Sequence, residues 1–260
     1  MESPDVFARF RLDGKLALIT GASGSLGEHF AHLLAAAGAR VLVAARRSDT
    51  LHTLVTRIAD QGGWARAIAL DVIDDKSVRA CFDDAEENVG VPTIIINNAG
   101  VTVSRPLLEQ SEQDWDRVIN TNLKGSWLVA TEAARRLIAA RQSGVIVNVS
   151  SILGLRVAGG VAPYAVSKAG LIQATAAMAL ELARHEIRVN ALLPGYIVTD
   201  LNREFLTSEA GEHLRKRIPS RRFGELSDLD GPLLLLASDA GRHMSGACVA
   251  VDGAHLTSSL

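Results

Sequence analysis

The sequence contains few residues that could form a disulfide framework or a metal centre. Its 260 residues include only two cysteines, Cys81 and Cys248, which lie far apart and fit no C-x-x-C pattern. We expect both thiols to be buried and unpaired, as in a cytoplasmic protein. The seven histidines form no H-E-x-x-H motif and no cluster with cysteine, so we predict no metal site.

A strong excess of one charge and long apolar runs are also absent. Lys and Arg number 27 against 29 Asp and Glu, and this near-balance gives no electrostatic case for nucleic acid or an anionic membrane. Residues 1–15 lack the apolar stretch of a secretory signal, and no run reaches the roughly 18–20 apolar residues of a membrane span. We therefore predict a cytoplasmic protein with neither nucleic-acid nor membrane partners.

Aromatic residues are scarce, at 4% of the chain, whereas hydrophobic residues make up 48%. That apolar content excludes intrinsic disorder, and a chain of this length can bury a large core. Because the sequence has only two tyrosines, Tyr164 and Tyr196, the position of each one becomes informative.

Short β-branched runs alternate with helical patterns along the chain. The predicted strands are 16–20, 41–44, 65–70, 93–96, 145–149, 187–192 and 248–251. The predicted helices include 26–37, 48–60, 74–89, 111–141 and 163–185. Apolar strands separated by helices are typical of parallel β-α-β units that are buried on both faces. We predict an α/β protein, a single-domain doubly wound Rossmann fold over residues 1–260 with about seven parallel strands flanked by helices.

The stretch 200–225 interrupts this regular pattern. It is polar and carries a group of basic side chains, namely Arg215, Lys216, Arg217, Arg221 and Arg222. A solvated helix face would explain such a stretch, and a mobile lid over a substrate is the functional alternative. We treat it as a candidate substrate lid.

Three glycines lie where the first predicted strand leads into the first helix. Gly21 suits a tight turn, the middle of the loop near Gly24 lets backbone approach a pyrophosphate, and Gly27 lets the helix pack close to the strand. The N–H groups and positive dipole of the helix N-terminus favour phosphate. This context predicts a dinucleotide site, with a glycine-rich turn that binds no ligand as the alternative.

Several further motifs follow in order. They are Asn97-Asn98-Ala99-Gly100, Asn122-Leu123-Lys124-Gly125, Ser150-Ser151, Tyr164-x-x-x-Lys168 and Pro194-Gly195. Together with the glycine loop they resemble the short-chain dehydrogenase/reductase family, in its 3-oxoacyl reductase-like branch, over about residues 12–253. In one departure from the family pattern, the middle glycine of the loop is Ser25 here, and Gly24 stands just before it.

Four residues match the catalytic tetrad of that family: Asn122, Ser151, Tyr164 and Lys168. Tyr164 and Lys168 are four residues apart and share one helix face, and a nearby ammonium lowers the pKa of a phenol toward neutral pH. The resemblance implies that Tyr164 is the general acid/base, that Ser151 polarises the carbonyl, and that Asn122 holds a water linking Lys168 to solvent. The offset of 13 residues before Tyr164 favours Ser151 over Ser150.

The resemblance also implies the cofactor contacts. Ala45 stands where NAD enzymes carry an acidic residue, and Arg46 follows it, which favours the 2′-phosphate of NADP(H) and leaves NAD(H) possible. A basic residue common in the glycine loop of NADP-using relatives is missing at Gly24. The predicted contacts are Gly21, Ser23, Ser25, Leu26, Arg46, Arg47, Asp71, Val72, Asn98, Ala99, Gly100, Tyr164, Lys168, Pro194, Gly195, Ile197 and Thr199.

These features predict an NADP(H)-dependent oxidoreductase that transfers a hydride between nicotinamide and a carbonyl or secondary alcohol. The alternatives are an NAD(H)-dependent alcohol or sugar dehydrogenase of the same family and a non-catalytic dinucleotide-binding sensor. The segment 153–162 is small and apolar, with Arg156 alone charged, which favours a modest uncharged carbonyl substrate. The resemblance implies a homotetramer or homodimer that pairs through the long helices on either side of the fifth strand.

Overall fold

Parallel strand pairing organises the molecule. The computed structural model describes residues 5–199 and 202–258, and these contain a seven-stranded parallel sheet in the order β3-β2-β1-β4-β5-β6-β7. The strands are β1 (Leu16–Thr20), β2 (Arg40–Ala45), β3 (Trp64–Ala69), β4 (Ile94–Asn97), β5 (Gly144–Val149), β6 (Ile187–Pro194) and β7 (Cys248–Val251). The predicted doubly wound α/β fold is therefore confirmed.

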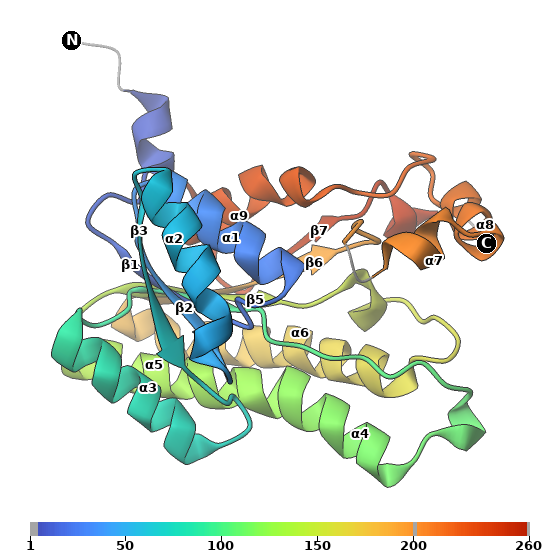
Figure 1. The fold of residues 1–260 in the computed structure, drawn as a ribbon, viewed down its shortest axis with the longest axis horizontal. Coiled ribbons are helices and arrows are strands. Elements are labelled where there is room, and N and C mark those ends of the chain that lie inside the picture. Colours follow the sequence, from blue (N-terminus) through green and yellow to red (C-terminus); the bar gives the residue numbers. More distant parts are fainter. Residues whose placement is uncertain (1–4, 200–201, 259–260) are drawn as a thin grey trace.

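Helices cover both faces of this sheet (Figure 1). One face carries α1 (Ser25–Ala36), α2 (His52–Asp60) and α9 (Asp230–Ala237). The other carries α3 (Asp75–Asn88), α5 (Ser126–Ala139) and α6 (Ala162–Leu182). The shorter helices are α4 (Glu112–Ile119), α7 (Arg203–Thr207) and α8 (Glu209–Arg217), of which α7 and α8 lie side by side in Figure 1.

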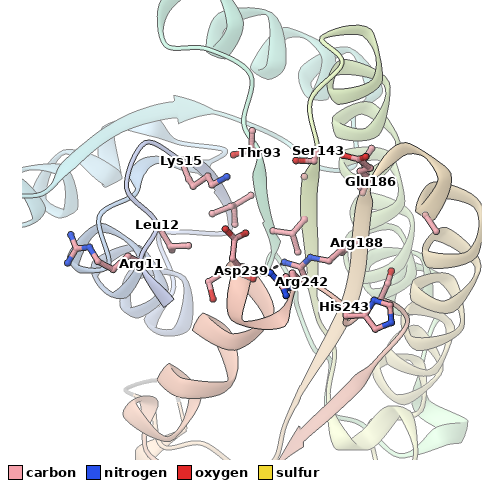
Figure 2. Close-up of a pocket in the computed structure, with 18 residues that line it drawn as sticks. Arg11, Leu12, Lys15, Thr93, Ser143, Glu186, Arg188, Asp239, Arg242 and His243 are labelled. Atoms are coloured by element: carbon pink, nitrogen blue, oxygen red, sulfur yellow. Dashed lines mark hydrogen bonds between the residues drawn. The ribbon is translucent and has the colours of Figure 1, made fainter. Parts of the chain in front are cut away.

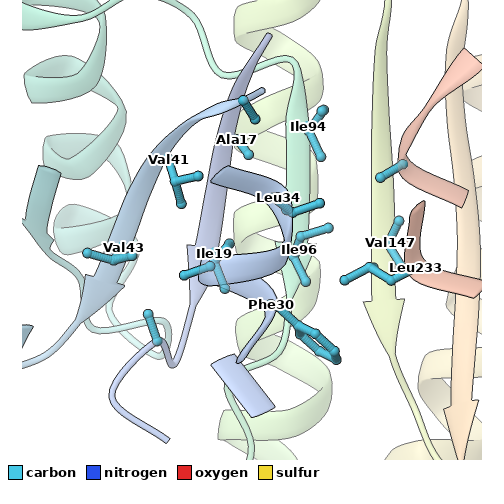
Figure 3. Packing of buried hydrophobic residues seen from close by; sticks show 14 of the residues in the cluster. Ala17, Ile19, Phe30, Leu34, Val41, Val43, Ile94, Ile96, Val147 and Leu233 are labelled. Atoms are coloured by element: carbon cyan, nitrogen blue, oxygen red, sulfur yellow. The ribbon is translucent and has the colours of Figure 1, made fainter. Parts of the chain in front are cut away.

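Alternate residues of the central strands contribute to two hydrophobic cores. Ala17 and Ile19 of β1 share one core with Phe30 of α1 (Figure 3), whereas Leu18 belongs to the opposite core together with Phe82 of α3. All five residues are fully buried. Burying a side chain of the size of Ile or Phe contributes roughly 1.5–3 kcal/mol, so the two cores hold the central strands in place.

The strand order reverses next to β1, which pairs with β2 on one side and with β4 on the other. In open α/β sheets, ligands bind in the crevice beyond the carboxyl ends of the strands at such a reversal. Thr20, Asn97 and Val149 end β1, β4 and β5, so the loops that follow these three strands surround the crevice.

The helix predicted over 111–141 is helical without a break from Glu112 to Ala139, but it is not α-helical throughout. The structure has α4 and α5 separated by a π-helical turn, Asn120–Gly125. A π turn inserts one residue and keeps the helical appearance of the sequence, so periodicity does not reveal it. The turn ends at Gly125, where a side chain would not fit because a Cβ would lie 2.7 Å from Cγ2 of Val72.

The expectation that both cysteines are buried holds for one of them. Cys81 is buried on α3, and burial raises the pKa of its thiol to about 12. Cys248 is exposed, because β7 is the last strand of the sheet and only part of its surface is covered.

The candidate lid over 200–225 contains more regular structure than its composition indicated. Helices α7 and α8 fill much of it, and the Ser208 side chain caps α8 by accepting from the Gly211 N–H at 3.2 Å. Asp200 and Leu201, at the start of the candidate lid, lie outside the described residues.

Candidate active site

The glycine loop is shaped by close contact between backbone segments. Gly21 has φ of +66°, and a Cβ there would lie 2.8 Å from Cα of Ala99. A Cβ on Gly27 would lie 2.8 Å from Cα of Ala22. Gly24 has no such constraint, because its nearest contact would be an ordinary 3.7 Å to the Gly21 carbonyl oxygen. Gly21 and Gly27 are thus required for packing, which leaves the middle of the loop open for a ligand.

The first turn of α1 is available to an anion. Its N-cap residue is Gly24, no side chain caps the helix, and Ser25 begins it. Ser23 is exposed, while Ser25 and Leu26 are half-buried. The first N–H groups of a helix lack internal partners, so this uncapped end fits the phosphates of a dinucleotide.

Thr20 joins the glycine loop to the turn after β4. Its hydroxyl oxygen accepts from the N–H groups of Asn98 and Ala99 at 3.1 and 3.0 Å. The Asn98 amide donates in return to the carbonyls of Thr20 and Gly21 at 3.0 and 3.2 Å. Sequence reasoning did not select Thr20, although a hydroxyl as the last residue of the strand was a usable signal.

The ends of β2 and β3 place four more predicted contacts at the same edge of the sheet. Arg46 and Arg47 follow the buried Ala45 and are exposed, and neither guanidinium has a hydrogen-bond partner among the described residues. The Asp71 carboxylate accepts from the Ile73 N–H at 3.3 Å, and Val72 is buried against the π-helical turn. An anionic group beyond Ala45 would therefore meet two uncommitted cations.

The four tetrad residues gather beside the end of β5. Lys168 is buried on α6, and its Nζ donates to the Val149 carbonyl at 2.8 Å and lies 5.5 Å from the centroid of the Tyr164 ring. Ser151 is buried two residues beyond Val149, and it lies close enough to Tyr164 to lower the pKa of that phenol. The Ser150 hydroxyl instead donates to the Lys168 carbonyl at 2.9 Å. Ser151, not Ser150, therefore lies next to the phenol.

The expected lowering of the Tyr164 pKa is not found in the ligand-free protein. Burial raises the pKa of Tyr164, and the hydrogen bond with Ser151 opposes this only in part. Burial also lowers the pKa of Lys168 to about 8. Desolvation disfavours the charged form of each group, and it is the largest cause of both shifts.

Asn122 belongs to the π-helical turn and closes the site from the side of α4. Its Oδ1 accepts from the Val101 N–H at 2.8 Å, and its Nδ2 donates to the Val101 carbonyl at 2.9 Å and to the Ser167 hydroxyl at 3.0 Å. A Cβ on Gly100 would lie 3.4 Å from Asn122 Oδ1 and 3.7 Å from Lys168 Nζ. The turn after β4 therefore passes directly over the tetrad.

The loop after β6 covers the other side of the crevice. Pro194 ends β6, and the Gly195 N–H donates to the Val251 carbonyl at 2.9 Å. The Asn202 amide donates to the Ile197 carbonyl at 2.9 Å and accepts from the Thr199 N–H at 2.8 Å. Asn202 was not among the predicted residues, although an amide side chain is a usual way to close a loop.

A cavity of about 580 Å³ lies at the opposite edge of the sheet (Figure 2). It is lined by Lys15, Ser143, Glu186 and Arg242, near the amino ends of the strands. The guanidinium of Arg188, which also lines it, donates to the Ser238 carbonyl at 3.1 Å. This cavity is remote from the tetrad and takes no part in the candidate active site.

Over residues 5–199 and 202–258, no three or more His, Cys, Asp or Glu side chains are grouped so that they could hold a metal ion. None of the helices in the same described part combines the length and the apolar character that a membrane span requires.

Comparison with known proteins gives consistent matches over nearly the whole chain. The family model described as enoyl-(acyl carrier protein) reductase matches residues 21–254. The chain is 37% identical over 243 residues to 3-oxoacyl-(acyl-carrier-protein) reductase FabG of Thermotoga maritima, covering 94% of this chain and 98% of that protein. It is 34% identical over 252 residues to 2-dehydro-3-deoxy-D-gluconate 5-dehydrogenase of Escherichia coli, covering 96% and 99%.

A solved structure extends the similarity to three dimensions. The crystal structure of a gluconate 5-dehydrogenase from Burkholderia cenocepacia, in complex with NADP and tartrate, matches with a TM-score of 0.93 and 36% identity, covering 97% of this chain and 99% of that one. The fold and these relatives define a dehydrogenase that acts on CH–OH groups. The chain belongs to the short-chain dehydrogenase/reductase family, in its 3-oxoacyl reductase-like branch.

The buried Lys168 makes the stability of the ligand-free protein depend on pH. The unfolded chain holds this proton up to about the ordinary pKa of 10.5, and the folded chain only up to about 8. Between these values the unfolded state binds more protons, so stability rises with pH across the window. Lys168→Met removes a buried charge that costs roughly 3 kcal/mol at pH 7, and loses a hydrogen bond worth about 1 kcal/mol.

We therefore expect Lys168→Met to stabilise the ligand-free protein by roughly 2 kcal/mol at pH 7 and by clearly less at pH 9.5, as measured by urea denaturation. Lys124→Met is the control, because Lys124 is exposed and should show the same small effect at both pH values. An effect of Lys168→Met that does not change with pH would contradict this prediction.

Proposed function

We propose that the protein is an NADP(H)-dependent oxidoreductase that interconverts a carbonyl compound and its secondary alcohol, with Tyr164 as the general acid/base. The proposal rests chiefly on the gathering of the Ser151 hydroxyl, the Tyr164 phenol and the Lys168 ammonium beside an uncapped helix N-terminus. Any one of these groups occurs in many proteins. A proton donor, an oxygen-binding hydroxyl and an anion site at one sheet edge are together what carbonyl reduction requires.

The residues present fit a nicotinamide dinucleotide. The first turn of α1 would hold the pyrophosphate, Asp71 and Val72 would contact the adenine, and the turn Asn98 to Gly100 would run along the cofactor. The Ile197 N–H, which has no partner among the described residues, and the Thr199 hydroxyl would bind the carboxamide. When bound, this cofactor supplies or accepts the hydride.

The residues at the end of β2 support NADP(H) over NAD(H) as the cofactor. No carboxylate is present at Ala45, and the exposed guanidiniums of Arg46 and Arg47 have no other partner in the described part of the chain. A 2′-phosphate would satisfy them, whereas an NAD ribose needs an acidic acceptor there. The Burkholderia cenocepacia relative with NADP in its crystal supports the same choice.

The tetrad residues divide the proton chemistry among them. In reduction, the Ser151 and Tyr164 hydroxyls donate to the carbonyl oxygen, and Tyr164 transfers its proton to the forming alkoxide. The raised pKa of Tyr164 keeps the phenol protonated at neutral pH, which is the form this direction needs. Lys168 positions the cofactor ribose, and Asn122 fixes the turn that passes over Lys168.

The proposal also covers the domain organisation, the substrate and the location of the protein. We assign the whole chain to a single domain in which the segment 202–225, with α7 and α8, covers the substrate. The relatives bear the names of reductases of 3-oxoacyl groups and of dehydrogenases of gluconate and its derivatives, so the family branch leaves the substrate open. A cytoplasmic location stays a prediction from cysteine usage.

Helices α5 and α6 support assembly into a homodimer or homotetramer. They expose apolar side chains, including Trp127 at 47%, Val166 at 47% and Leu180 at 82% of their surface. Exposed apolar side chains grouped on neighbouring helices are typical of an interaction surface. A second copy of the chain would bury them.

Removal of the Arg46 guanidinium tests the cofactor preference. We expect Arg46→Ala to raise the KM for NADPH about tenfold or more and to leave the KM for NADH nearly unchanged, because a charge-assisted hydrogen bond to phosphate is lost. Steady-state kinetics with both cofactors measures this. Arg9→Ala is the control, since Arg9 is exposed near the amino edge of the sheet. Equal loss with both cofactors would refute the NADP(H) assignment.

Removal of the phenol tests the reaction itself. We expect Tyr164→Phe to lower kcat at least about a hundredfold, which is the usual contribution of a general acid, while the Kd for NADPH changes little. Reduction of a panel of ketones and fluorescence titration of NADPH measure the two quantities. Full activity in this variant would refute the role of Tyr164, and tight cofactor binding without turnover in the unmodified protein would favour the sensor.

Sedimentation tests the assembly. We expect the unmodified protein to sediment as a dimer or tetramer, and Leu180→Glu to dissociate it, because a charge would be placed in an apolar contact. Leu108→Glu is the matched control, as Leu108 is 97% exposed in a loop before α4. A monomer mass for the unmodified protein would overturn the proposal.

A further inference from the structure

Three segments far apart in the sequence converge on the last turn of the described chain, residues 252–258. The Ser220 N–H, just after α8, donates to the Gly253 carbonyl at 3.2 Å. The Arg156 guanidinium, from the loop after β5, donates to the His255 carbonyl. The ring of Tyr196, from the loop after β6, lies 5.7 Å from the ring of His255. Residues 252–258 therefore lie next to Tyr196, between the loops after β5 and β6 and the end of α8.

Arg156 is held rigidly but without a countercharge. Its Nη1 donates to the His255 carbonyl and to the Ser258 hydroxyl, the latter at 2.6 Å, and both acceptors are neutral. The carboxylate of this turn, Asp252, is already engaged, because it accepts from the Ala254 and Leu256 N–H groups at 3.0 and 2.7 Å. The half-buried guanidinium of Arg156 therefore has no carboxylate partner within the described part of the chain, and some of its N–H groups form no hydrogen bond there.

Arg217 brings a second cation to the same place. It is the last residue of α8, directly before the fully buried Ile218, so the helix end is fixed against the last turn. Its neighbours on the helix, Arg215 and Lys216, both pair with Glu212. Arg217 is exposed and has no hydrogen-bond or ion-pair partner among the described residues.

Both cations lie near Tyr196 and His255. Burial raises the pKa of Tyr196, and Arg217 and Arg156 each act in the opposite direction. Burial and the same two guanidiniums lower the pKa of His255, whose buried Nδ1 lacks a partner in the described chain. Tyr196 in turn contributes to the raised pKa of Tyr164. The arginine pair Arg156 and Arg217 therefore lies where the Tyr196 loop meets the turn 252–258.

We propose that the arginine pair binds a carboxylate of the substrate, so that this enzyme acts on hydroxy acids or oxo acids whose charged end lies beyond Tyr196. The inference rests on the proposed function, because it concerns the substrate of that same site. It replaces the expectation of an uncharged substrate, which considered the segment 153–162 alone. Arg217 reaches the site only through the folding of α8 against the last turn, so the local sequence did not reveal it.

Two probes with the same carbon skeleton test this proposal. D-gluconate carries a carboxylate where D-glucitol carries a neutral hydroxymethyl group. We expect the NADP-loaded enzyme to bind gluconate at least about tenfold more tightly than glucitol in calorimetry at fixed ionic strength. A carboxylate held by guanidinium groups gains charge-assisted hydrogen bonds that the alcohol lacks.

Variants of the arginine pair test whether it causes the difference in affinity between gluconate and glucitol. We expect Arg217→Gln to weaken gluconate binding about tenfold and to leave glucitol binding and the Kd for NADPH within about twofold. Arg217→Lys should restore part of the loss, and Lys216→Gln, which removes the neighbouring charge, should have no effect. Arg156→Lys is the second variant, with thermal melting used to verify that the last turn stays folded.

The outcomes separate this inference from the proposed function. Tyr164-dependent reduction of a neutral ketone such as cyclohexanone by NADPH, together with equal binding of gluconate and glucitol or no binding of gluconate, would overturn the carboxylate site alone. Equal losses from Arg217→Gln and Lys216→Gln would overturn it as well. Failure to bind NADPH or to reduce any ketone would overturn the proposed function.

Discussion

The close approach of the turn after β4 to the glycine loop determines the geometry of the whole site. The Gly21 backbone and Ala99 are so near that a Cβ would not fit between them, and the Thr20 hydroxyl bridges the two segments with two accepted hydrogen bonds. Because this contact lies where the strand order reverses, it sets the distance between the candidate phosphate site and Lys168. The positions of Gly100, Asn122 and the π-helical turn follow from it.

The tetrad is placed at a cost to stability. Lys168 carries an ammonium into a fully protein-lined position, where a single carbonyl, that of Val149, accepts from it. Tyr164 is similarly shifted toward its neutral form by burial. Both shifts arise from desolvation, and a ligand that brings charge or hydrogen bonds into the crevice would change them. Lys168 and Tyr164 would therefore gain hydrogen bonds or charged partners when a ligand binds in the crevice.

The sequence predicted most of the fold because the signals involved are local. The strands of the sheet follow from β-branched runs, and Gly21 and Gly27 follow from a turn and a close packing contact that tolerate no side chain. The π-helical turn was missed because one inserted residue hardly alters helical periodicity. The exposure of Cys248 depends on β7 being the last strand of the sheet, and the sequence of a single strand does not predict its place in the strand order.

The last turn of the chain has a consequence for how this enzyme could diversify. Arg156 contacts the His255 carbonyl and the Ser258 hydroxyl there, and Leu256 of the same turn packs against Ala191 and Leu193 of β6. Substitutions of exposed residues around it, such as Arg217, leave the central strands intact and usually alter stability little. Selection for a new substrate could therefore act on a few codons for residues around this turn while the chemistry of the interior is inherited unchanged.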